Sequence, residues 1–196
     1  DFLSAARQGV WQLLPLGPLG YGNSPYSATS AFAGNPLLIS LERLADYGWI
    51  DRSKIGTLPA SGPVQYDKVF AQKMPLLFEA TRSFLRSASS EALRRFESFQ
   101  KENSWWLDDF VLFDAIRSRQ KLAPWNQWPH DLAHREPAEL EKVRKELADD
   151  IRIRSALQFA FYEQWRALRR YSAERSIRVV GDVAIFVNHD SADVWT

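Results

Sequence analysis

Cysteine is absent from the 196 residues of this chain, which excludes disulfide bonds and thiol chemistry. That absence fits a cytoplasmic location, because disulfides form and persist in oxidising compartments. Neither sign of charge dominates: 25 lysines and arginines against 24 aspartates and glutamates leave a formal net charge of +1. Nucleic-acid binding normally shows as a clustered basic face, and no basic run suggests a membrane surface. We therefore expect neither nucleic acid nor a membrane as a partner.

Long apolar runs and metal-binding patterns are also missing. No run approaches the roughly 18 residues of a membrane span, and no secretory leader is recognisable. The three histidines match no zinc pattern. His130 and His134 are four residues apart, but Pro129 and the surrounding loop pattern argue against a shared helix face. Phosphate-loop, dinucleotide and nucleophile-elbow motifs do not occur. We expect no metal and no cofactor.

Aromatic residues, in contrast, are abundant, at 13% of the chain with eight tryptophans. Large rings build cores, and exposed rings also stack on the apolar faces of sugars. Trp125 and Trp128 lie in a proline-flanked loop, where they form either an exposed stacking pair or an attachment of the loop to the core. We favour attachment to the core.

Two short apolar segments, residues 10–16 and 177–181, predict β-strands that each follow a helical pattern. Residues 55–64 and 122–137 are predicted to be irregular. Helices are predicted over residues 1–8, 41–47, 66–87 (interrupted by Pro75), from Ser90 onward, 105–119 and 137–172. An α/β arrangement with a helix-rich insertion at about residues 40–145 fits two consecutive units of a (β/α)₈ barrel, or a smaller α/β domain.

Both ends of the sequence suggest an internal piece of a longer enzyme. Residue 1 falls inside a helical pattern with no N-cap before it, and the last residue follows Trp195 directly. We expect residues 1–196 to form part of a single catalytic domain.

The loop of residues 17–36 is rich in Gly, Pro, Ser and Asn, and such long loops are usually functional or disordered. Gly20 and Gly22 allow tight turns, and Pro25 biases Ser24 toward extended geometry. Tyr26 is thereby held rigidly, and its ring and hydroxyl can both contact a sugar. The alternative is a tyrosine that packs under its own loop.

Asp182 follows the second predicted strand. Gly181 suggests a bend, so we favour a short strand that places Asp182 at its carboxyl end over a longer one that places residues 188–190 there. A structural alternative is that Asp182 pairs with an arginine from a neighbouring strand. Asp190, Ser191 and Asp193 are predicted to cap a helix.

Residues 11–39, WQLLPLGPLGYGNSPYSATSAFAGNPLLI, and residues 181–195, GDVAIFVNHDSADVW, resemble two signatures of the amylomaltases, which are 4-α-glucanotransferases. The resemblance implies a (β/α)₈ barrel that transfers α-1,4-glucan segments to a glucose or malto-oligosaccharide acceptor by a retaining mechanism. It places Tyr26 at the glucan subsites next to the scissile bond, and Tyr21 with Phe70 at a secondary glucan contact. We add Ser24, in the same loop, as a candidate substrate-binding residue.

The resemblance makes Asp182 a supporting active-site carboxylate. The nucleophile and the acid/base of the family lie downstream of the second signature, so this span alone is expected to be inactive. Two alternatives remain at this point, a non-catalytic α-glucan-binding protein and a related α-glucan hydrolase.

Overall fold

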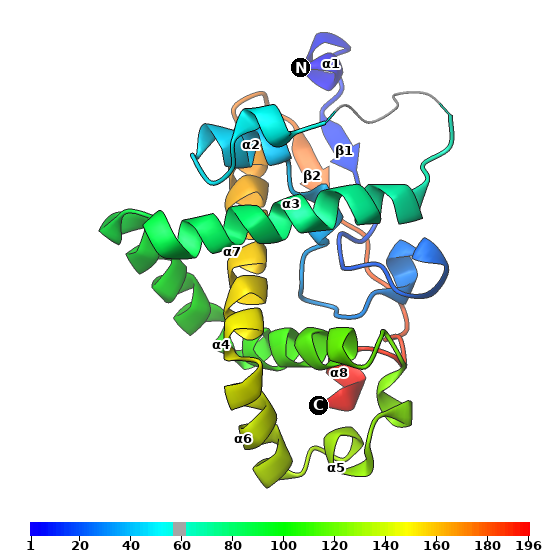
Figure 1. Ribbon diagram of the computed structural model, residues 1–196. Helices are drawn as coiled ribbons and strands as arrows, with labels where there is room; N and C mark the ends of the chain where they lie inside the picture. Colours follow the sequence, from blue (N-terminus) through cyan, green and yellow to red (C-terminus); the bar gives the residue numbers. More distant parts are fainter. Residues whose placement is uncertain (57–61) are drawn as a thin grey trace.

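The computed structural model describes residues 1–56 and 62–196 (Figure 1). The predicted irregular segment 55–64 therefore lies partly outside the described residues. The strands are β1 (Val10–Gln12) and β2 (Arg178–Val180). The helices are α1 (Phe2–Ala5), α2 (Leu41–Asp46), α3 (Tyr66–Ser87), α4 (Ser90–Arg119), α5 (His130–Ala133), α6 (Pro137–Glu146), α7 (Ala148–Ala173) and α8 (Ala192–Trp195). Single 3₁₀ turns are η1 (Tyr21–Asn23), η2 (Pro25–Ser27), η3 (Pro36–Leu38), η4 (Arg52–Lys54) and η5 (Trp125–Gln127).

The two strands pair in parallel, with Trp11 opposite Val179. Both predicted strands are confirmed, and the short form of the second is correct, but β1 is shorter than predicted. One further ladder bond, from the Leu13 amide to the Val180 carbonyl at 2.9 Å, precedes Pro15. Proline has no amide hydrogen for the ladder, so the strand ends before it. The chain is thus an α/β fragment with α2 to α7 inserted between the strands.

Helix α4 corrects the prediction of two separate helices from Ser90 and over residues 105–119, because it runs unbroken for 30 residues. The polar residues between them do not cap a new helix. Asn103 donates its side-chain amide to the Phe99 carbonyl at 2.8 Å, and Ser104 bonds to the Lys101 carbonyl. Side chains that bond backward along a helix are compatible with its continuation.

Two further predictions about helices are corrected. The segment predicted as one helix over residues 137–172 is divided at Leu147 into α6 and α7, and no glycine or proline marks that break. The segment 122–137, predicted to be irregular, contains α5. Pro129 is its N-cap, where a missing amide hydrogen costs no helical bond. His130 and His134 therefore share a face after all, with ring centroids 4.1 Å apart.

The core lies where α3 and α4 pack against α7 (Figure 1). Its centre is aromatic: Phe84 stacks on Trp49 with centroids 4.0 Å apart, and contacts Phe96 and Phe159 at 5.8 and 5.7 Å. A second, aliphatic cluster joins α2 and α3 to α7 around Leu44. No helix in the described part of the chain is long and apolar enough to cross a membrane.

Candidate functional site

The carboxyl ends of β1 and β2 open onto the same edge of the sheet, because the strands are parallel. Residues 13–36 leave β1 there, and residues 181–190 leave β2. This edge is where α/β proteins collect binding residues. The two segments are also bonded to each other: Asn188 donates its side-chain amide to the Ser27 carbonyl at 3.2 Å, and the Ala192 amide donates to Thr29 at 2.9 Å.

Tyr26 and Asp182 meet at this edge although they are 156 positions apart in sequence. The Tyr26 hydroxyl donates to Oδ2 of Asp182 at 2.6 Å, and the Val183 amide donates to Oδ1 at 2.8 Å. Among the described residues, no arginine forms an ion pair with Asp182. The structure therefore does not support the alternative interpretation, in which Asp182 only pairs with an arginine from a neighbouring strand. Each carboxylate oxygen keeps a lone pair free for another donor.

The tyrosine hydroxyl in this pair is a persistent donor. The hydrogen bond to Asp182 raises the pKa of Tyr26 above its ordinary value, and partial desolvation and the negative charge of Asp182 add to the effect. The phenol therefore stays protonated at neutral pH. Tyr26 remains 45% exposed, so its ring face is accessible to a ligand rather than packed under its own loop.

The local fold of the loop explains why Tyr26 is held in place. Ser24 accepts the Tyr26 amide at 3.3 Å on its hydroxyl, and Pro25 begins η2. A Cβ at Gly20 would lie 2.0 Å from the Ser27 carbonyl oxygen, so only glycine fits. Gly22 has φ of +69°, a conformation that glycine adopts readily. In this structure Ser24 positions Tyr26.

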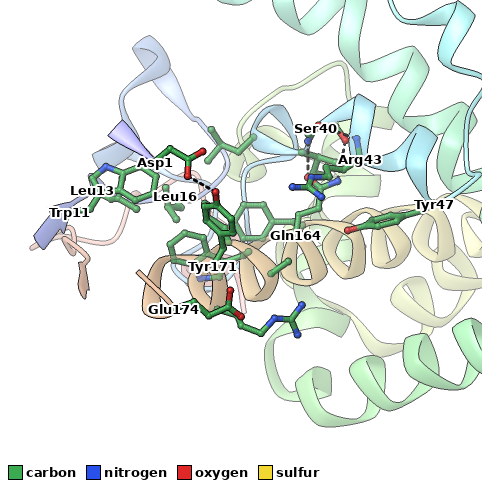
Figure 2. A pocket seen from close by; sticks show the side chains of 17 residues that line it. Asp1, Trp11, Leu13, Leu16, Ser40, Arg43, Tyr47, Gln164, Tyr171 and Glu174 are labelled. Carbon is green, nitrogen blue, oxygen red and sulfur yellow. Dashed lines mark hydrogen bonds between the residues drawn. The ribbon is translucent and has the colours of Figure 1, made fainter. Parts of the chain in front are cut away.

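A small cavity of about 150 Å³ lies between the two segments, with Tyr26 and Asp182 both in its wall. A larger one, of about 820 Å³, lies elsewhere, between β1, residues 38–47 and the carboxyl-terminal half of α7 (Figure 2). There Tyr171 donates to Asp1 at 2.5 Å, and the remaining wall is mostly apolar. We place the candidate site at the smaller cavity, because polar groups converge there at the carboxyl ends of both strands.

Tyr21 and Phe70 lie outside this pair. Tyr21 is 92% exposed on η1, and Phe70 is 52% exposed on α3. No ring–ring contact joins the two within the part of the chain that the structure describes. A groove of about 410 Å³ is lined by Asn23, at the end of η1, and by residues 64–68, at the start of α3, and neither ring lines it. Both rings are exposed.

Two glutamines of α7 hold the backbone at the end of the loop of residues 17–36 and just after it, and were not predicted from the sequence. Gln158 exchanges two hydrogen bonds with the Gly34 backbone, at 2.7 and 3.0 Å, and is buried. Gln164 does the same with Ser40, at 2.7 and 3.0 Å. The one signal in the sequence was a glutamine inside the apolar stripe of a helix, between Leu157 and Phe159.

The segment after β2 is fixed by an ion pair that overturns the capping prediction for Asp190. Arg117 donates to Asp190 Oδ2 at 3.0 Å, and the Trp125 amide donates to its Oδ1 at 3.2 Å. Ser191 occupies the predicted N-cap position of α8, although its hydroxyl forms no capping hydrogen bond. Asp193 lies in the first turn of α8 as predicted, and also accepts from the Ala31 amide. Tertiary partners compete with local capping for these side chains.

The structure supports attachment to the core for Trp125 and Trp128. Trp128 is 5% exposed, packs on Phe113 and donates to the Ala123 carbonyl at 2.9 Å. Trp125 donates to the His189 carbonyl at 2.7 Å and stacks on that imidazole. The described residues contain no group of three or more side chains that could hold a metal ion.

Comparison with known proteins gives consistent results. A family model described as 4-alpha-glucanotransferase matches residues 1–196. A 4-alpha-glucanotransferase of Thermus thermophilus is 42% identical over 99% of this chain and 38% of its own length. The chloroplastic/amyloplastic 4-alpha-glucanotransferase of Solanum tuberosum is 38% identical over 100% of this chain and 35% of its own length.

The fold has a solved relative, an amylomaltase from Streptococcus agalactiae in complex with acarbose. It superposes with a TM-score of 0.93 and 32% sequence identity, over 100% of this chain and 40% of the relative. The chain therefore spans about two fifths of the length of the relatives it matches.

Proposed function

Since this chain belongs to the 4-alpha-glucanotransferase family, we propose that it is the substrate-binding part of an enzyme that transfers α-1,4-glucan segments to a glucose or malto-oligosaccharide acceptor. The observation that carries the proposal is the Tyr26–Asp182 hydrogen bond at the carboxyl ends of two parallel strands. In a (β/α)₈ barrel this is the face where active sites lie. We place β1 and β2 as neighbouring strands of such a barrel, with a helical insertion at about residues 40–145, which spans α2 to α6.

Retaining enzymes that act on glycosides need two carboxyl groups roughly 5–5.5 Å apart, one as nucleophile and one as acid/base. In this proposal both are supplied from outside the 196 residues. A transferase delivers the covalently held sugar to an acceptor hydroxyl in place of water, so the acceptor must be bound and oriented.

Binding and orientation are the proposed work of this chain's own residues. The exposed ring of Tyr26 stacks on a sugar, and the free lone pairs of Asp182 accept hydrogen bonds from sugar hydroxyls. Because Tyr26 and Val183 already fix the carboxylate, little order has to be gained on binding. Tyr21 and Phe70 are proposed to form a secondary glucan contact, and Ser24 to support Tyr26. A cytoplasmic location is proposed from the absence of cysteine.

The experiment that tests the proposal is incubation of the complete protein with maltotriose, with products separated by size. A ladder of longer malto-oligosaccharides together with glucose is the expected result. Release of glucose and maltose without longer products would replace the transferase by an α-glucan hydrolase. Glucan binding with no turnover would replace it by a non-catalytic binding protein.

A further inference from the structure

Two aromatic rings form an exposed pair where the loop of residues 17–36 meets α4. The ring centroids of Phe32 and Trp105 lie 4.6 Å apart, with an interplanar angle of 72°. Phe32 is 45% exposed and Trp105 is 65% exposed. The pair therefore leaves a large apolar ring face in water next to the core instead of burying it. Exposed aromatic rings offer a stacking surface to the apolar face of a ligand.

The backbone beneath Phe32 is fixed before any ligand arrives. Tyr162 donates its hydroxyl to the Phe32 carbonyl at 2.5 Å, and the Phe32 amide donates to the Ser30 hydroxyl at 3.1 Å. The Tyr162 ring packs against Phe99 and Trp106 of α4. Phe32 is thus held by both long helices, α4 and α7, and the cost of ordering it on binding is small.

A polar groove of about 310 Å³ lies between α4 and α7, and neither ring of the pair lines it. Ser98 and Glu102 do line it, and Trp105 follows them at i+7 and i+3 on the same face of α4, about one helical turn beyond Glu102. Glu163 of α7 pairs with Arg95 and, at 3.3 Å, with Arg166. The charged residues that line the groove are three arginines and three glutamates: Arg94, Arg95, Arg166, Glu91, Glu102 and Glu163.

The equal numbers of positive and negative side chains in this groove favour a neutral ligand over a charged one. A groove with equal numbers of both charges offers no net attraction to nucleic acid or to an acidic peptide. It does offer many hydrogen-bond donors and acceptors to a neutral ligand that is rich in hydroxyl groups. A flat, exposed ring about one helical turn beyond it provides the stacking surface for the apolar face of a sugar.

We propose that the Phe32–Trp105 pair and the groove one turn away along α4 form a further binding site for an α-1,4-glucan chain, separate from the Tyr26–Asp182 pair and from the proposed contact at Tyr21 and Phe70. The ligand class rests on the proposed function, while the site rests on the exposed rings and the neutral groove. Phe32 lies six positions after Tyr26 on the same loop, so a glucan held here stays tethered near the Tyr26–Asp182 pair. Tethering raises the local concentration of long chains relative to short ones.

The test is native electrophoresis of the complete protein in gels of increasing glycogen concentration, which gives a dissociation constant from the loss of mobility. Trp105→Ala is expected to weaken glycogen binding about threefold to tenfold through loss of the stacking ring. Trp105→Phe keeps a ring and is expected to retain most of the affinity. Tyr47→Ala removes another aromatic side chain that is 45% exposed, on a different element, and is expected to bind glycogen like the unaltered protein.

Equal dissociation constants for Trp105→Ala and the unaltered protein would overturn the proposal, as would an equal loss for Tyr47→Ala. Glycogen that binds at the Tyr26–Asp182 pair contributes equally to the dissociation constants of all variants. The differences between these constants therefore measure the contribution of the Trp105 ring. The outcome of the maltotriose experiment does not depend on the outcome of the glycogen experiment. Glucan transfer with no effect of Trp105→Ala on glycogen affinity would overturn only the site at Phe32 and Trp105. A glycogen affinity that depends on Trp105, with no glucan transfer, would overturn only the proposed activity.

Discussion

The helices between the strands are held together by rings, whereas the loops beside the strand ends are held by hydrogen bonds from side chains to backbone. Phe84, Phe96 and Phe159 are each no more than 3% exposed and contact one another. The loops instead depend on Gln158, Gln164 and their paired bonds to backbone amides. Rings that contact a ligand have to stay accessible, so a ligand-binding surface cannot bury them for stability.

The contacts between the two regions are made mainly by side chains of the helices, which bond to the backbone or side chains of the loops. Side chains of the helical region reach out to fix the loops, as Gln158 does at Gly34, Tyr162 at Phe32 and Arg117 at Asp190. The ring of Phe161 also lies where a Cβ on Gly34 would have to go, at 2.0 Å. Damage to the core should therefore disturb the loops, while damage to the loop surface should leave the core intact.

The largest expected effect tests the aromatic core. Phe84→Ala removes the ring that contacts Trp49, Phe96 and Phe159, and such truncations lower the free energy of unfolding by about 3–5 kcal/mol. Urea unfolding of the complete protein, followed by tryptophan fluorescence, measures the loss. Phe2→Ala is the control, because Phe2 is 82% exposed and its truncation should change stability by less than about 0.5 kcal/mol. Similar losses for both variants would show that rings do not hold this region.

The next effect tests the attachment of the loop. Gln158→Leu keeps the side-chain volume roughly constant but leaves the buried amide and carbonyl of Gly34 without partners, at a cost of about 1–3 kcal/mol for each group. Hydrogen exchange followed by mass spectrometry should show faster exchange in residues 17–36. Gln164→Leu makes the matched change at Ser40, which is only partly buried, and should cost less. Unchanged exchange in Gln158→Leu would mean that other contacts hold the loop.

A smaller effect separates function from stability at the loop surface. Tyr26→Phe removes the hydroxyl that donates to Asp182, so that only the Val183 amide still holds the carboxylate. We expect the kcat/KM for maltotriose transfer to fall about fivefold, with stability unchanged within about 0.5 kcal/mol. Tyr47→Phe is a matched control with the same exposed fraction. A stability loss in Tyr26→Phe that approaches that of Phe84→Ala would contradict the contrast between the two regions.

The smallest effect is a titration. The hydrogen bond to Asp182 raises the pKa of Tyr26. The contribution of this hydrogen bond to the stability of the fold is therefore fully present below the ordinary tyrosine pKa, and it is lost as the pH rises through the raised pKa. Absorbance near 295 nm during alkaline titration, compared between Tyr26→Phe and the unaltered protein, isolates this group. The difference between the two titration curves is the ionisation of Tyr26 in the unaltered protein, and we expect it above about pH 10, the ordinary tyrosine pKa. Ionisation at or below that pH would show that the bond is absent in solution.

Much of the architecture is readable from local pattern. The sequence predicted both strands, the helix-rich insertion and the rigid turn around Tyr26, because hydrophobic period, glycine and proline act over a few residues. Predictions failed where tertiary contacts compete with local signals. A separate helix was predicted over residues 105–119, but Asn103 and Ser104 just before it bond within α4, and Asp190 was predicted as a cap but pairs with Arg117.

Sequence alone therefore determined which residues stand at the ends of the strands, and the tertiary structure decided which of them touch. Tyr26 and Asp182 could each be singled out, but their hydrogen bond joins positions 156 apart, and the Gln158–Gly34 bonds join positions 124 apart. Periodicity and turn chemistry carry no information about partners at such separations. Only the parallel pairing of β1 with β2 and the packing of α7 against the loops bring those groups within bonding distance.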